Sequence, residues 1–231
     1  MAEDHPTGKP ARRELALLLT LAAVQFTHIV DFMIMMPLGP QFMRLFGIGP
    51  QQFGALVSAY TFAAAASGFI AAFWIDRFDH KRALLALYAG FIVATALCGV
   101  APNYALLIAA RAVAGVFGGV IGGLVFAIVA DAVPYERRAR ATAVVAASFS
   151  LAAVAGVPLA LWLAVHFSWR APFLVLAAAS VGVGAAAMRI LPPLRAHLAH
   201  HQTRHPVLRL RLIFGVPNHL RAFALDRKSV V

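Results

Sequence analysis

Cysteine and charged residues are both scarce in this sequence. Its single cysteine, Cys98, excludes an intramolecular disulfide. Only 13% of the 231 residues are charged, whereas 61% are hydrophobic, and a soluble domain of this length cannot bury so much apolar surface in one core. No Gly-Lys-Ser/Thr loop for binding nucleotide phosphates is present. A membrane is therefore the expected solvent for most of the chain.

Six long apolar blocks divide the chain. Away from the ends of the blocks, the only charged residues are Asp31 and Arg111. Each block is close to the roughly 20 residues that an α-helix needs to cross a bilayer, about twice the length of a barrel strand. We predict an all-α fold with six transmembrane helices, over residues 15–37, 53–75, 83–101, 104–130, 141–165 and 171–191.

Acidic residues are also few, with nine Asp and Glu against twenty Lys and Arg. The resulting charge of +11 does not indicate a nucleic-acid partner, because the cations gather in alternate loops, as in membrane proteins. The opposite loops carry only Arg44 and Arg170. We therefore predict a bacterial inner-membrane protein with a cytoplasmic tail at 1–14 and both termini in the cytoplasm. The cations on the predicted cytoplasmic side before span six are Lys9, Arg12, Arg13, Arg77, Lys81, Arg82, Arg137, Arg138 and Arg140.

The loop after the second span reads AFWIDRFDHKRALL, from Ala72 to Leu85. It resembles the loop signature of the Major Facilitator Superfamily, Gly-x-x-x-Asp-Arg-x-Gly-Arg-Lys/Arg, and departs from it at Ala72, Asp79 and His80. The resemblance implies a gating loop whose acidic residue faces a helix N-terminus in the other half of a transporter, where the dipole favours an anion. Charges that merely set topology are the alternative. The matching charged positions are Asp76, Arg77, Lys81 and Arg82.

The loop after the fourth span, DAVPYERRARATA, also resembles the family pattern. Asp131 and Arg138 are the expected gating residues there. A solvated basic loop would explain the composition of this segment but not its occurrence together with the other motifs.

The fourth span, LLIAARAVAGVFGGVIGGL, contains Arg111 followed by glycines four residues apart. Small residues at this spacing let helix backbones approach closely. A central arginine costs at least about 2.5–3.5 kcal/mol to insert, so it should face protein or a wet cavity. The span is similar to the family's fourth-helix motif, which implies a transport role for Arg111. A structural role, in which the arginine caps carbonyls or reaches interfacial water, remains open.

The first span carries Gln25, His28 and Asp31 on one helical face. It resembles the first helix of efflux members of the family, where an acidic residue takes part in proton or substrate handling. Alternatively, Asp31 reaches interfacial water, and Phe32 and Met35 are packing residues. The predicted proton and substrate cavity consists of Gln25, His28, Asp31, Phe32, Met35, Arg111, Gly115 and Gly118.

The fifth span is expected to kink at Gly156 and Pro158, because proline removes a helical donor. This pair partly resembles the fifth-helix Gly-Pro motif of efflux members, although the Gly pair that follows in those proteins is absent.

The segment 192–231 is expected to be a cytoplasmic linker leading to an incomplete seventh helix. Its final residues, DRKSVV, are what a common short-read sequencing adapter encodes before a stop codon. We therefore expect a truncated sequence whose native part ends near Leu225.

The resemblance implies one half of a twelve-helix transporter, built from two inverted three-helix repeats, with access alternating by rocking of the halves. We predict secondary active efflux of a small organic solute, coupled to protons because Asp31 is titratable, and expect no enzymatic activity, cofactor or metal site. The expected partners are the solute, protons, the bilayer and a missing C-terminal six-helix half.

Alternatives to this function are an inert fragment, a homodimeric half-transporter or, with less support, an intramembrane protease. A protease needs a buried Ser and a His on another span, whereas Ser67 has no evident partner and span six contains no His.

Overall fold

The structure is a computed structural model that describes residues 9–194, and within this range it is helical without strands. The expectations for residues 1–8 and for the linker and seventh helix after residue 194 lie outside the described residues. The elements are α1 (Lys9–Met33), α2 (Gly39–Phe46), α3 (Pro50–Ala71), η1 (Ile75–Arg77), α4 (His80–Val100), α5 (Tyr104–Ala132), α6 (Tyr135–Leu151), η2 (Ala152–Gly156), α7 (Val157–His166) and α8 (Ala171–Ile190).

Six segments of these helices are long and apolar enough to cross a membrane, which confirms the predicted number of spans. They are Arg12–Met33, Pro50–Ala71, His80–Val100, Tyr104–Ala132, Tyr135–His166 and Ala171–Ile190. The fifth begins six residues before the predicted start, because a polar helical turn precedes its apolar part.

The first span ends four residues earlier than predicted. Its helix ends at Met33, a turn follows, and a separate short helix, α2, begins at Gly39 with Pro40 in its first turn. Pro37 lies in the turn between the two helices, where its missing N–H removes no helical hydrogen bond. α2 ends at Phe46 and is capped by Gly47, whose positive φ of 62° is a conformation that glycine adopts readily.

The fifth span is divided by the π-helical turn η2, which lies between α6 and α7. Pro158 follows at the start of α7, and Gly156 closes the π turn. A Cβ on residue 156 would lie 2.3 Å from Cγ2 of Val30, so the glycine also lets the fifth span approach α1. The predicted irregularity in this span is thus a π turn, with the proline just beyond it.

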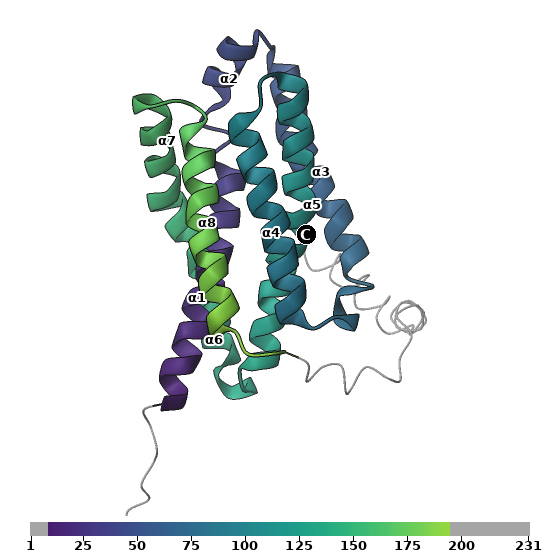
Figure 1. The fold of residues 1–231 in the computed structure, drawn as a ribbon, viewed down its shortest axis with the longest axis vertical. Helices are drawn as coiled ribbons and strands as arrows, with labels where there is room; N and C mark the ends of the chain where they lie inside the picture. The colour runs from purple at the N-terminus through teal and green to yellow at the C-terminus, as the bar shows by residue number, and fades with distance from the viewer. Residues whose placement is uncertain (1–8, 195–231) are drawn as a thin grey trace, which may run out of the picture.

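The helices form one elongated bundle, in which α1, α3 and α4 are the first three spans and α5, α6–α7 and α8 are the last three (Figure 1). α5 packs along both α3 and α4, while α1 packs against α6 and α8. One apolar core, which includes Leu21 and Ile128, fills the end at which α6 begins, and a second core, which includes Phe42 and Phe173, fills the end near α2.

The contact between α3 and α5 is a backbone contact made possible by glycine. A Cβ on residue 115 would lie 2.3 Å from the carbonyl oxygen of Tyr60, and one on residue 119 would lie 2.2 Å from that of Ala64. Real Cβ contacts are never this short, so both positions require glycine at this helix separation. The predicted close approach of a neighbouring helix to the small-residue face of the fourth span is therefore present.

Candidate transport site: a buried ion pair beside an apolar pocket

Asp31 and Arg111 form an ion pair in the interior of the bundle. The Oδ2 atom of Asp31 accepts a hydrogen bond of 2.7 Å from an Arg111 guanidinium nitrogen, and Thr95 donates to Oδ1 at 3.3 Å. Asp31 is 0% exposed and Arg111 is 1% exposed. α1, α4 and α5 thus each supply one member of the group. Because burial removes both charges from water, each one needs the other as its counter-ion.

Tyr60 of α3 completes the surroundings of the arginine. The Arg111 guanidinium carbon lies 4.4 Å from the centroid of the Tyr60 ring, within cation–π range. The ring reaches this position over Gly118, where a Cβ would lie 2.2 Å from the Tyr60 hydroxyl oxygen and 3.1 Å from Cδ2 of His28. Glycine at position 118 therefore makes room for two polar side chains beside the ion pair.

Polar atoms without partners gather in this region. Oε1 of Gln25, Nδ1 of His28 and the Tyr60 hydroxyl oxygen are buried and make no hydrogen bond within residues 9–194. An unpaired buried polar atom costs about 1–3 kcal/mol, so such groups usually have a water, an ion or a ligand as partner. The structure thus places Gln25, His28, Asp31 and Arg111 on the interior of the bundle, where the first and fourth spans were expected to meet.

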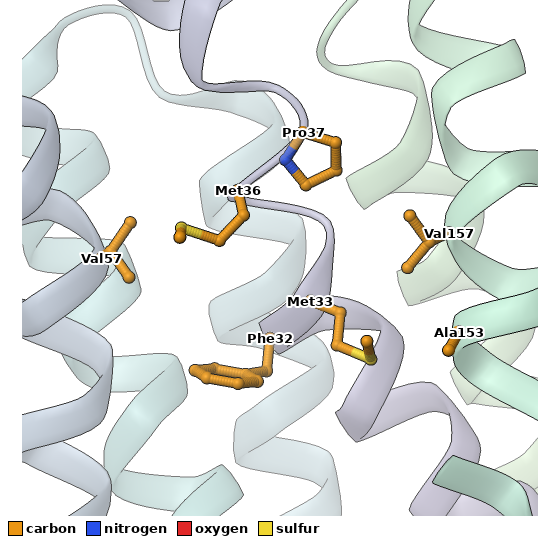
Figure 2. Close-up of a pocket in the computed structure, with 7 residues that line it drawn as sticks. All are labelled: Phe32, Met33, Met36, Pro37, Val57, Ala153 and Val157. Carbon is orange, nitrogen blue, oxygen red and sulfur yellow. The ribbon is translucent and has the colours of Figure 1, made fainter. Parts of the chain in front are cut away.

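An apolar pocket of about 400 Å³ opens next to this polar group. Figure 2 shows side chains from the end of α1 and the following turn between Val57 on one side and Ala153 and Val157 on the other. Phe32 is the link between the pocket and the ion pair, because its ring lies 5.5 Å from the Tyr60 ring, centroid to centroid. The lining residues are Phe32, Met33, Met36, Pro37, Val57, Ala153 and Val157.

Met35 lies apart from the pocket. Its side chain is 0% exposed and belongs to the apolar core that contains Phe42. Met33 and Met36, which the sequence analysis did not select, line the pocket instead. The reason is the end of α1 at Met33, since the turn that follows changes the direction of the side chains after that residue.

The predicted gating residues lie at the end of the bundle where α4 and α6 begin (Figure 1). Oδ2 of Asp131 accepts a hydrogen bond of 2.8 Å from Nδ1 of His80, and Oδ1 of Asp76 lies 3.8 Å from Nε2 of the same ring. Arg77 stacks on Trp74 with its guanidinium carbon 4.9 Å from the ring centroid. His80, which departs from the family signature, is thus the residue that brings the two acidic gating positions together.

The remaining gating cations bind backbone carbonyls or face outward. Arg138 donates to the carbonyls of Ala130 and Val133, at 2.6 and 3.5 Å, and so ties the start of α6 to the end of α5. Lys81 donates to the carbonyl of Leu191, and Arg82 is exposed. These residues hold the connections between spans in place.

Two residues of the site, Tyr60 and Thr95, were missed by the sequence analysis. Tyr60 is a single tyrosine in one apolar span and Thr95 a single threonine in another, so neither forms a motif. Ser67, considered as a protease nucleophile, donates to the carbonyl of Ala64 in its own helix.

Comparison with known proteins agrees with this arrangement. Residues 21–225 match the family model of the Major Facilitator Superfamily. The chain is 31% identical over 173 residues to an uncharacterised MFS-type transporter, YceJ, of Bacillus subtilis, which covers 75% of this chain and 44% of that protein. It is 30% identical over 158 residues to a chloramphenicol efflux pump of Mycobacterium tuberculosis, covering 66% of this chain and 38% of the pump. The chain thus spans less than half the length of these relatives.

Solved structures show the same fold. The superfamily's proton:xylose symporter XylE superposes with a TM-score of 0.73 at 12% identity, over 92% of this chain and 52% of the symporter. A bacterial homologue of the lysosomal transporter Spinster gives a TM-score of 0.68 at 17% identity, over 81% of this chain and 44% of the other. From the matching family model, the six spans and these relatives, we conclude that this chain is an integral, multi-pass membrane protein of the Major Facilitator Superfamily.

Proposed function

We propose that the chain forms the N-terminal half of a secondary active transporter that exports a small organic solute in exchange for protons, and that it acts without catalysing a chemical reaction. The observation that carries this proposal is the buried pair of Asp31 and Arg111, 2.7 Å apart, beside an apolar pocket. Efflux and multidrug resistance proteins among the relatives support the direction of transport.

The ion pair is suited to couple a proton to a conformational change. While Asp31 is ionised, its carboxylate holds Arg111 of α5 against α1 by a charge-assisted hydrogen bond. Protonation of Asp31 removes the charge from one partner and weakens that link between the two repeats. Binding of a proton and the contact between α1 and α5 therefore depend on each other, as an alternating-access cycle requires.

The pocket favours an uncharged, apolar solute. All seven lining side chains are apolar, and the nearby carboxylate of Asp31 is already neutralised by Arg111 and fully buried. A lipophilic cation would therefore find no carboxylate among the residues that line this pocket. Met33 and Met36 have flexible side chains that adapt to ligands of different shape. We infer that neutral amphiphilic molecules are preferred over permanent cations.

The orientation in the membrane follows from the distribution of cations. Arg and Lys are concentrated in the turn between α3 and α4 and in the first turns of α4 and α6, which lie at one end of the bundle (Figure 1). By the positive-inside rule, we place this end and both termini in the cytoplasm. In this proposal, the other six helices come from a C-terminal half. Solute counterflow in proteoliposomes that contain only this chain would support the alternative, a homodimeric half-transporter.

Asp31→Asn in the full-length protein tests the proton role. Asparagine keeps the size of the side chain; its amide oxygen can accept from Arg111 and its NH2 group can donate to the Thr95 hydroxyl, but it cannot exchange a proton. We expect transport driven by a pH gradient to fall at least about tenfold, which corresponds to about 1.4 kcal/mol. Solute exchange without a gradient should persist. Transport assays in proteoliposomes measure both rates.

The matched control is Glu14→Gln, which removes a carboxylate that pairs with exposed Arg137 at 3.0 Å outside the site. It should leave gradient-driven transport unchanged. Undiminished proton-coupled transport by the Asp31→Asn protein would remove Asp31 from the mechanism.

Ala153→Phe tests the pocket. The added ring would occupy much of the 400 Å³ space, so the KM for a neutral amphiphilic solute such as chloramphenicol should rise about tenfold. Val154→Phe is the control, because the neighbouring side chain is 78% exposed and lies outside the pocket. Equal effects of the two substitutions on KM would show that the pocket does not bind the solute.

A further inference from the structure

Phe32 lines the apolar pocket and also contacts a residue of the polar group. The residue is 39% exposed, and Figure 2 shows its ring extending from α1 toward the side of the pocket on which Val57 of α3 lies. Its neighbour on α3 is Tyr60, one helical turn after Val57, with the two ring centroids 5.5 Å apart. A solute that fills the pocket therefore packs against Phe32, and a change in the position of Phe32 reaches Tyr60.

Tyr60 connects Phe32 to the ion pair. Its ring centroid lies 4.4 Å from the guanidinium carbon of Arg111, and Arg111 in turn donates to Oδ2 of Asp31 at 2.7 Å. Three side-chain contacts in series thus lead from the pocket to the carboxylate. The series begins and ends on α1, and it passes through α3 and α5.

The ring of Tyr60 has freedom to move that its backbone lacks. The backbone is fixed against α5, since a Cβ on residue 115 would lie only 2.9 Å from the Tyr60 Cα. The ring, in contrast, lies over Gly118, and its hydroxyl group makes no hydrogen bond within residues 9–194. The position of the ring is therefore set by its two ring contacts and not by a hydrogen bond.

We propose that Tyr60 is a positioning residue that transmits solute binding in the apolar pocket to the Asp31–Arg111 pair; this inference rests on the proton exchange proposed above. A bound solute packs Phe32 against Tyr60, which keeps the Tyr60 ring on the guanidinium and Arg111 at the ionised carboxylate. Protonation of Asp31 has the reverse effect, because it removes the negative charge that holds Arg111 in place beside the Tyr60 ring. The Tyr60 and Phe32 rings then shift toward the pocket and reduce its affinity for solute.

The expected dependence on pH has one sign. Solute and proton oppose each other, so the Kd for solute should be lower at high pH, where Asp31 is ionised, than at low pH. Of the other elements packed against α1, η2 contains no titratable residue, and the charged residues of α6 and α8 lie at the ends of those helices. The titratable and charged groups that face Asp31 are Arg111 of α5, Tyr60 of α3, Cys98 of α4 and His28 of α1.

Binding of radiolabelled chloramphenicol, a neutral amphiphilic probe, to the full-length protein in lipid nanodiscs tests this series of contacts. Equilibrium dialysis gives the Kd at pH 5.5 and at pH 8.5, and the ratio of the two values is the readout. We expect a ratio of about tenfold in the unmodified protein, within the usual range of coupling between two binding sites. Tyr60→Leu should reduce the ratio to less than about twofold, because the coupling between the sites is lost. Tyr60→Phe keeps an aromatic ring on the guanidinium and should restore most of the ratio.

A second variant interrupts the series without changing Tyr60. Phe32→Leu replaces a partly exposed side chain, so the protein should fold, and the ratio should again fall to less than about twofold. Tyr104→Leu is the matched control. This tyrosine also joins α3 and α5, because it donates to the carbonyl of Gln52 where both helices begin, but it lies outside the site. Its ratio should equal that of the unmodified protein.

The possible results separate this inference from the proposed function. A role of Tyr60 in packing alone would raise the Kd equally at both pH values. An unchanged ratio in Tyr60→Leu or in Phe32→Leu would therefore overturn the role of Tyr60 and leave proton exchange at Asp31 intact. If Tyr60→Leu does not fold, Phe32→Leu decides the question. A Kd that is independent of pH in the unmodified protein, or a ratio that persists in Asp31→Asn, would overturn the proposed function and this inference with it.

Discussion

Arg111→Gln should destabilise the chain by about 3–5 kcal/mol, because removing one partner of a buried ion pair leaves the other charge unpaired away from water. Asp31 is 0% exposed and would keep only the 3.3 Å hydrogen bond from Thr95. Glutamine is shorter than arginine and uncharged, and it would also lose the contact with the Tyr60 ring. The free energy of unfolding, measured by titration of the purified chain from mild detergent into dodecyl sulfate, is the appropriate readout.

A second substitution tests the cause. In Asp31→Asn/Arg111→Gln both partners are neutral amides that can hydrogen bond to each other, so most of the lost stability should return, with a coupling energy of about 2 kcal/mol or more. Arg82→Gln serves as the control, since this arginine is exposed and its loss should change stability by less than about 0.5 kcal/mol. Equal stability of the Arg111→Gln and Arg82→Gln chains would mean that the buried pair is not needed for folding.

Gly115→Ala/Gly119→Ala should separate α3 from α5. The new methyl groups would lie 2.3 and 2.2 Å from the backbone carbonyl oxygens of Tyr60 and Ala64, and backbone atoms cannot move aside as a flexible side chain can. Overpacking of this kind costs about 1–3 kcal/mol per site, which outweighs the gain of up to about 1 kcal/mol when alanine replaces glycine in a helix. We expect a net loss of several degrees in the unfolding temperature.

The control for this pair lies on the same helix. A Cβ on residue 123 would meet nothing within 4 Å, so Gly123→Ala should keep or raise the unfolding temperature. If Gly123→Ala and the double variant lower it equally, the loss comes from glycine at any position in α5, and the close contact between α3 and α5 is not its cause.

The number of spans and most of their bounds could be predicted because hydrocarbon imposes a simple length requirement. The fourth span, predicted at 104–130, is the helix Tyr104–Ala132, and the sixth, predicted at 171–191, is Ala171–Ile190. The length of an apolar block is a poor predictor of where a helix ends near the membrane surface. It did not show that α1 ends at Met33 or that α2 forms beyond Pro37, although Pro40 at a helix start and Gly47 at its end were visible signals.

The interior of the site could be predicted in part. A charged residue inside a span must find a partner, so pairing Asp31 with Arg111 required only that their helices be neighbours. The contributions of Tyr60 and Thr95 depend on how α3 and α4 rotate about their axes, which packing against α5 decides. His80 was recognised as a departure from the family signature, but its position between two carboxylates requires the turn at η1 and the end of α5 to be known.

The π turn at Ala152–Gly156 affects how the fifth span is compared with those of other proteins. Such a turn holds one residue more than the α-helical turn it replaces, and a residue advances an α-helix by 100° and 1.5 Å. A relative whose fifth helix is uninterrupted therefore aligns with this chain only if one residue in 152–156 is left unmatched. Without that gap, every position from Val157 to His166 is paired with a residue from a different face of the relative's helix.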